Sequence, residues 1–387
     1  MLDSEEILTK VIGAKNTTHH TNGFHPYAAK FIPQIPNYLI LRYSHVGNTI
    51  LDPFCGSGTT LVEAKLLNRS AIGVDINPIA TLISKVKTTQ INEKRINQMA
   101  EVINKINKNI IRLYQDNQSD LTKKAEQCVS TIEFHNKEHW FQKNVLAEIL
   151  TIQDDVKSSG LTQDMQDFLL LCLSSIIVHV SNQESETRYA AINKKIPSFR
   201  TFELFKNKAI TLSNKLIIFN KEASKSKIDV FCRDSRNLEF IADNSVDLIV
   251  TSPPYPNTYD YYLYHKMRMY VLGFDVTKVR DNEIGSRNKH SSQKMSIESY
   301  YKDMRECFIE FERVLKPRKK FGIVIGDAVI RNEKIDGIEM ISNICEQTNL
   351  KMVNEVSYDS SKASKMFNTA FRSSNKKEHI ILLENKK

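Results

Sequence analysis

The sequence predicts an α/β protein built on a doubly wound, largely parallel sheet and interrupted by a helical insertion. Several short apolar runs, such as Val246–Val250, end abruptly at glycine, proline or aspartate, as strands buried on both faces do. Between residues 91 and 225 the apolar residues recur instead with helical spacing. We therefore expect residues 1–90 and 226–387 to form the N-terminal and C-terminal parts of one sheet domain, and 91–225 to form the insertion.

The composition is that of a globular protein with a basic surface. The chain has 387 residues, with 54 Lys and Arg against 45 Asp and Glu, and its net charge of +9 favours a polyanionic partner without proving one. No apolar run approaches the ~18 residues of a membrane span, and the start Met1–Glu6 is acidic where a secretory signal is basic. We expect a cytoplasmic protein without membrane contact. The six scattered cysteines predict neither a disulfide framework nor a metal site.

A first strand, Thr49–Asp52, leads into a glycine turn and then a helix. Gly56 and Gly58 allow a tight turn and a close approach to a ligand, and the helix start adds free N–H groups. The spacing fits neither the dinucleotide fingerprint nor the triphosphate-binding loop. A second strand, Ala71–Val74, ends at Asp75, about 20 residues after the turn, where an acid is placed to accept hydrogen bonds from ribose hydroxyls.

The strand Val246–Val250 ends in Thr251-Ser252-Pro253-Pro254-Tyr255. Paired prolines can neither extend the ladder nor start a helix, so the chain must leave the sheet in a rigid, extended turn. The turn displays Ser252 and Tyr255 at the carboxyl end of a strand, where open α/β sheets bind ligands. Its free carbonyls beside an aromatic ring suit a flat base that carries an amino group.

These motifs together resemble one enzyme family. Asp-Pro-Phe-Cys-Gly-Ser-Gly-Thr from Asp52, Gly-Val-Asp-Ile-Asn-Pro from Gly73 and the Ser-Pro-Pro-Tyr turn are similar to those of the S-adenosylmethionine-dependent amino-methyltransferases of DNA. The resemblance covers residues 23–90 and 227–386, and it implies a seven-stranded sheet with an antiparallel last strand and S-adenosylmethionine as cofactor. It also implies that Asp234, after the third strand, binds the adenine amino group. The expected cofactor-binding residues are Phe31, Asp52, Pro53, Phe54, Gly56, Gly58, Thr59, Asp75, Ile76, Asp234 and Ser235.

The turn is the expected catalytic site, formed by Ser252, Pro253, Pro254 and Tyr255. Ser252 Oγ and the Ser252 or Pro253 carbonyl would hold the amino hydrogens, while Tyr255 would stack on a base flipped out of the duplex. In this family Ser at position 252 is the usual mark of cytosine N4 methylation, which leaves adenine N6 as the alternative. An RNA methyltransferase or an inactive DNA-binding relative is a further alternative. Ring-carbon methylation would need a cysteine in a Pro-Cys turn, which the sequence lacks.

The expected partner is double-stranded DNA with a flipped base, and a companion restriction endonuclease or other defence proteins are possible partners. Residues 91–225 and the segment 259–295 compete for target recognition. The polar run Ser181–Tyr189 reads equally as a loop or as a DNA-contacting surface, and Lys278–Met295 reads as a loop that orders on DNA. The expected DNA-binding residues are Arg188, Tyr259, Lys266, Arg268 and Arg372.

Overall fold

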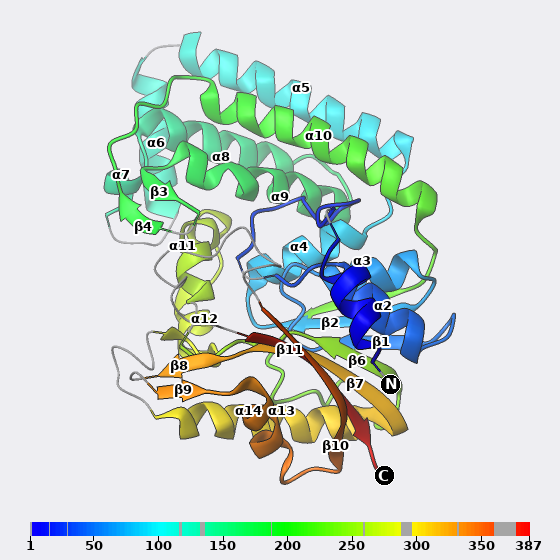
Figure 1. Cartoon of the computed structure of the whole chain (residues 1–387). Helices are drawn as coiled ribbons and strands as arrows, with labels where there is room; N and C mark the ends of the chain where they lie inside the picture. Colours follow the sequence, from blue (N-terminus) through cyan, green and yellow to red (C-terminus); the bar gives the residue numbers. More distant parts are fainter. Residues whose placement is uncertain are drawn as a thin grey trace.

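The fold was analysed in a computed structural model of the whole chain (Figure 1). The structure describes residues 2–387 except 15, 29, 116–117, 132–135, 187, 258–259, 288–295, 331–332 and 360–376. Within this part of the chain, no helix is both long enough and apolar enough to span a membrane.

A seven-stranded sheet forms the centre of the molecule, in the order β10-β11-β7-β6-β1-β2-β5. All strand pairs are parallel except those made by β11, which runs antiparallel to both β7 and β10. The predicted fold class, including the antiparallel last strand, is confirmed. The strands are β1 Thr49–Asp52, β2 Ser70–Asp75, β5 Ile228–Cys232, β6 Val246–Thr251, β7 Leu315–Gly326, β10 Leu350–Asp359 and β11 Lys377–Asn385.

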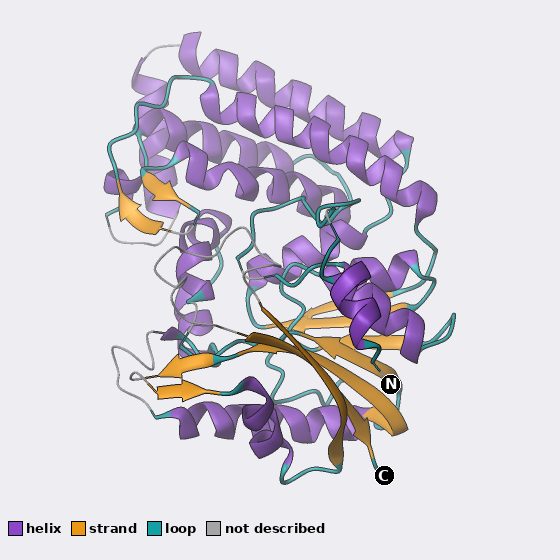
Figure 2. Ribbon diagram, in the orientation of Figure 1, coloured by secondary structure: helices purple, strands orange, loops and turns teal. Residues whose placement is uncertain are grey.

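Helices cover both faces of the sheet (Figure 2). On one face pack α2 (Gln34–Tyr43) and α3 (Thr59–Leu66), and on the other α13 (Ile297–Val314) and α14 (Gly337–Cys345). Strand side chains alternate between the two cores: Val324 of β7 joins the α2 core, whereas its neighbours on either side join the α13 core. Burial on both faces explains why the strands read as continuous apolar runs.

A layer of helices lies beyond α4 (Pro78–Thr88), as Figure 1 shows. Its apolar stripes form one core with α4, in agreement with the helical spacing read from the sequence. Whether residues 91–225 form a separate domain stays a prediction. The helices of this layer are α5 Glu93–Gln115, α6 Gln118–Thr131, α7 Lys137–Trp140, α8 Lys143–Lys157, α9 Gln163–Val180 and α10 Arg200–Glu222.

Three segments differ from the sequence expectation. The polar run after α9 forms a β-hairpin rather than a loop, with β3 Gln183–Ser185 antiparallel to β4 Arg188–Ala191. The predicted loop from 278 begins inside the helix α12 (Val276–Asn282). Asp275 caps the start of this helix, because its carboxylate accepts from Lys278 N. Strand β7 begins at Leu315, six residues before Phe321, where the sequence predicts its start. The remaining elements are α1 Ser4–Glu6, η1 Ile7–Val11, α11 Tyr261–Leu272, β8 Ala328–Ile330 and β9 Glu333–Ile335.

Candidate active site

A cavity of about 840 Å³, including its open mouth, lies at the carboxyl ends of the parallel strands. This is the edge where open α/β sheets bind ligands. The predicted residues that line it are Phe31, Phe54, Gly56, Thr59, Asp75, Ile76, Asp234, Ser235, Ser252 and Pro254. The structure therefore brings both predicted groups, the cofactor residues and the catalytic turn, to one cavity.

Two glycines shape the turn after β1 in different ways. Gly58 has φ +74° and precedes α3, and a Cβ there would lie 2.6 Å from Ser84 Oγ, so this glycine serves the packing of α4. Gly56 has φ +47°, and a Cβ there would lie 3.1 Å from the ring of Tyr27. Gly58 thus does not line the cavity, whereas Gly56 does.

Asp75 ends β2 with its carboxylate held between two backbone donors. Its Oδ2 accepts from Gly56 N at 2.9 Å and its Oδ1 from Asn77 N at 2.8 Å. Each oxygen keeps a second lone pair for a ligand hydroxyl. Burial raises the pKa of Asp75 to about 6. Asn77, not Asp75, caps α4 by accepting from Ile79 N.

Asp234 is oriented by an arginine. Its carboxylate accepts from Arg236 Nε at 3.0 Å and from Nη2 at 2.6 Å, and the same guanidinium reaches Asp303 of α13 at 2.7 Å. The neighbouring Ser235 Oγ donates to the Pro53 carbonyl. The exit loop of β5 is thereby fixed against both the turn after β1 and α13.

Asp52 lies beneath the cavity rather than in its wall. It is fully buried and accepts from Thr251 Oγ1 at 2.6 Å and from Phe54 N at 3.2 Å. Burial raises its pKa to about 6. Asp52 therefore joins the end of β1 to the end of β6, and it does not form part of the cavity lining, nor does Pro53.

The predicted catalytic turn is held from two sides. Tyr300 of α13, itself buried, donates its hydroxyl to the Pro254 carbonyl at 3.1 Å. Pro253 is buried, and Tyr255 turns away from the cavity lining to place its hydroxyl 3.0 Å from Glu378 Oε1 on β11. Burial raises the pKa of Tyr255 well above its ordinary value. The hydroxyl of Tyr255, rather than its ring face, therefore has a defined partner in this structure.

The sequence reasoning missed several cavity residues. They come from the segment before α2, from the turns after β1 and β2, from the start of α11, and from α12 and the stretch after it. They are Tyr27, Lys30, Cys55, Ser57, Asn77, Tyr261, Val279, Asn282, Glu283 and Ile284. The aromatic and proline-rich run 23–33 was one signal for Tyr27 and Lys30. The sequence carried no signal for Glu283 and Ile284, because the stretch after α12 reads as a polar loop.

Glu283 is the most unusual of the missed residues. It is 5% exposed, and its carboxylate accepts from Tyr261 N at 2.7 Å and from Tyr262 N at 3.3 Å, at the start of α11. Burial raises its pKa to about 8. The buried acid Glu283 thus both lines the cavity and caps the start of α11.

The five predicted DNA-binding residues have different fates. Arg268 is 1% exposed and bonded to Ser174 O at 3.0 Å and to Glu186 at 2.5 Å, so the structure places it in the interior instead of on a DNA-facing surface. Lys266 is partly buried, with its Nζ 5.3 Å from the ring centroid of Tyr189. Arg188 is exposed beside Glu184, while Tyr259 and Arg372 lie outside the described residues.

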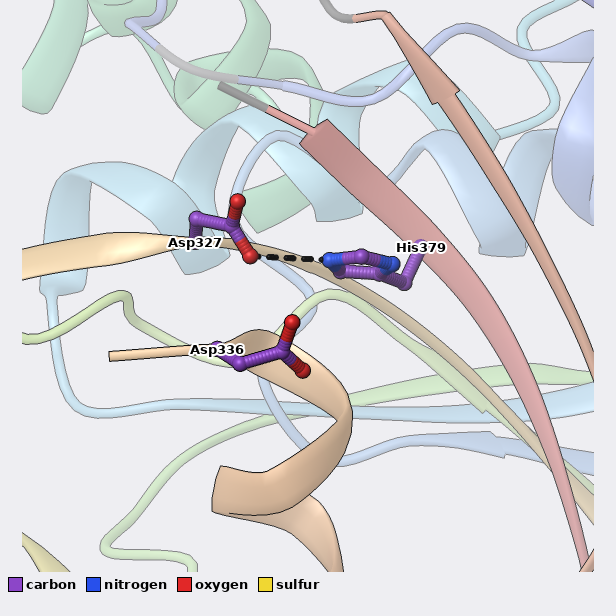
Figure 3. A group of neighbouring side chains, drawn as sticks. All are labelled: Asp327, Asp336 and His379. Atoms are coloured by element: carbon purple, nitrogen blue, oxygen red, sulfur yellow. Dashed lines mark hydrogen bonds and ion pairs between the residues drawn. The ribbon is translucent and has the colours of Figure 1, made fainter. Parts of the chain in front are cut away.

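A second polar group lies beyond the catalytic turn, where Asp327, Asp336 and His379 approach one another within the spacing of a metal site (Figure 3). The Asp327 carboxylate, however, already interacts with His379 Nε2, Lys334 Nζ and two backbone N–H groups. Asp336 caps α14. We interpret the group as a hydrogen-bonded link between the ends of β7, β11 and α14.

The sequence is similar to those of known methyltransferases. A family described as DNA methylase matches residues 5–86 and 246–387. The chain is 26% identical to the type II methyltransferase M.MjaII of Methanocaldococcus jannaschii over 400 residues, covering 82% of this chain and 74% of that protein. It is 22% identical to the type II methyltransferase M.MvaI of Kocuria varians, covering 87% of this chain and 83% of that protein.

Proposed function

The chain belongs to the DNA methylase family, and on that premise we propose that it methylates the exocyclic N4 of a flipped-out cytosine within a specific sequence of double-stranded DNA. The amino-methyl chemistry and the donor, S-adenosylmethionine, follow from the family. The choice of base, the flipping and the target are the proposed parts.

The cavity fits the donor in the charge of its lining. Asp75 and Asp234 give the wall two carboxylates, which suit a cationic ligand with ribose hydroxyls and an amino group. We assign the ribose to Asp75 and the adenine amino group to Asp234. When bound, the donor supplies an electrophilic methyl group.

One observation carries the proposal: Ser252 and Pro254 line the same cavity as Asp75. The Pro254 carbonyl already accepts from Tyr300, so we assign the substrate amino group to Ser252 Oγ and to the Ser252 or Pro253 carbonyl. These acceptors would draw the delocalised lone pair back onto the nitrogen by holding its hydrogens. A base stacked in a duplex cannot reach a turn at the edge of the sheet, so it must be flipped out.

Ser252 also carries the choice of base, because serine at this position is the family's usual mark of cytosine N4 methylation. The relatives named type II methyltransferases support a site-specific enzyme with a companion endonuclease. The basic charge of +9 suits the DNA backbone, and Arg188 is an exposed candidate for contacting it.

Target recognition is assigned jointly to the two candidate segments. The Arg268–Glu186 ion pair, with its arginine buried, joins α11 to the β3–β4 hairpin, and Lys266 lies over Tyr189 of the same hairpin. A chimera that exchanges only 91–225 would break this contact. Exchanging residues 91–225 together with 259–295 between relatives of different specificity should transfer the sequence preference; an unchanged preference would refute the assignment.

The test is to identify the methylated nucleoside. DNA of mixed sequence is incubated with the protein and isotopically labelled donor, digested, and analysed by mass. We expect labelled N4-methylcytosine, formed at least tenfold more slowly with Ser252→Ala. Labelled N6-methyladenine would replace the base assignment, whereas 5-methylcytosine or no transfer at all would refute the proposed chemistry.

A further inference from the structure

The hydroxyl of Tyr255 lies in the middle of a chain of hydrogen bonds in which each hydroxyl donates to the next group. Ser252 Oγ donates to the Tyr255 hydroxyl at 3.4 Å, and that hydroxyl donates to Glu378 Oε1 at 3.0 Å. The Val324 carbonyl also lies 3.4 Å from the Tyr255 oxygen, but the carboxylate is nearer and charged, so it is the stronger acceptor. The chain therefore runs from the substrate side of the turn to an acid on β11.

We propose, on the basis of the amino-methylation argued above, that Ser252, Tyr255 and Glu378 form a relay that carries a proton from the substrate amino group to the Glu378 carboxylate. Ser252 is the catalytic residue of this relay because it contacts the substrate. Tyr255 and Glu378 act through it.

The relay balances the reaction. Forming the nitrogen–carbon bond as the sulfur–carbon bond breaks leaves the amino nitrogen positively charged, and it becomes neutral when one N–H bond returns its electron pair to nitrogen. That proton passes to Ser252 Oγ, the Ser252 proton passes to the Tyr255 oxygen, and the Tyr255 proton passes to Glu378 Oε1. Serine and tyrosine end neutral as they began, and Glu378 ends protonated.

The surroundings fix the middle of the relay. A Cβ at Gly326 would lie 3.1 Å from Tyr255 Cε2, so the ring lies directly against the backbone of β7 and its hydroxyl has little freedom to move. Burial holds the pKa of Tyr255 well above its ordinary value. Tyr255 can therefore hand on a proton only while it receives another, and it is not the final acceptor.

The surroundings also fix the acceptor. The second oxygen of Glu378 accepts from the Tyr358 hydroxyl, and Tyr358 lies directly opposite on β10. The backbone of the neighbouring Lys377 forms two hydrogen bonds with Asp327: the Lys377 carbonyl accepts from Asp327 N–H at 3.0 Å, and Lys377 N–H donates to Asp327 Oδ2 at 3.3 Å. The start of β11 is thus anchored, and the partly exposed Glu378 can release the proton to solvent.

The test compares Tyr255→Phe and Glu378→Gln with Glu384→Gln, a control on the same strand that pairs with Lys320. Single-turnover methylation is measured in H₂O and D₂O, together with donor affinity by calorimetry and the melting temperature. Tyr255→Phe keeps the ring, and Glu378→Gln keeps the shape of the side chain. Each should slow methyl transfer by about 100-fold, in the range of general base catalysis. The donor affinity should stay within about twofold of the wild-type value, and the melting temperature within a few degrees of it.

Three further results decide the proposal. Acetate should restore part of the rate of Glu378→Ala but not of Tyr255→Phe, since only the former lacks the terminal base. Wild-type rates in both Tyr255→Phe and Glu378→Gln, or in Glu378→Gln alone, would overturn the relay while leaving the proposed function intact. A wild-type protein that does not methylate an amino group would refute the function instead. If Glu378→Gln fails to fold, Tyr255→Phe and Glu378→Asp carry the test.

Discussion

The raised pKa of Glu283 predicts a pH-dependent loss of stability that Glu283→Gln abolishes. Because its pKa rises from 4.5 in the unfolded chain to about 8 in the folded protein, the folded state binds more protons between these values. Stability then falls as pH rises through this window and is level above it. The shift of about 3.5 units, at about 1.4 kcal/mol per unit, corresponds to at most about 5 kcal/mol across the window.

Urea unfolding at pH 5, 6, 7, 8 and 9 measures this effect as a difference between the wild type and Glu283→Gln. The glutamine places an NH₂ group against Tyr261 N or Tyr262 N, which adds a constant penalty but no pH dependence. The wild type should therefore lose up to about 1.4 kcal/mol per pH unit relative to the variant between pH 5 and 8. Glu239→Gln, at an exposed position, is the control. Equal pH slopes for wild type and Glu283→Gln would refute the buried-acid reasoning.

Four other substitutions separate binding, chemistry and folding. Ser252→Ala should lower turnover by at least tenfold with donor affinity nearly unchanged, whereas Asp75→Ala should weaken donor binding, measured by calorimetry, more than it lowers turnover; equal losses would show that the two roles are misassigned. Arg268→Ala should lower the free energy of unfolding, measured in urea, by about 3 kcal/mol because it removes the ion-pair partner of Glu186. A change in DNA affinity without a loss of stability would contradict the interior placement of Arg268. Tyr300→Phe, which removes the donor to the catalytic turn, should reduce turnover with little effect on donor affinity.

The parts of the site that follow a strand directly were predictable from sequence. The apolar run, the glycine turn and Asp75 lie within 27 consecutive residues, from Thr49 to Asp75, so local rules of strand, turn and helix fix their order. The same holds for the Ser252 turn, because two prolines exclude the alternatives. The seven-stranded sheet and its antiparallel last strand followed from the resemblance, and the structure agrees with both.

The environments of Arg268 and Tyr255 could not be predicted from sequence because they depend on contacts between distant segments. Arg268 stands among tyrosines and cations that look like a DNA surface, but its environment is set by Ser174 on α9 and Glu186 in the hairpin, more than 80 residues earlier. Tyr255 was expected to stack on the base, and its partner Glu378 lies 123 residues later. Nothing in the local sequence signals either contact.

The catalytic turn is connected to elements on every side, and this explains how a short proline turn can serve as a precise acceptor. Thr251 binds Asp52 of β1, the Pro254 carbonyl binds α13, and Tyr255 binds β11. Acceptors that are fixed before the reaction need no reorganisation as charge develops on the amino nitrogen. Loosening any one contact should therefore reduce turnover before it reduces donor affinity, because Asp75 and Asp234 are held by other bonds.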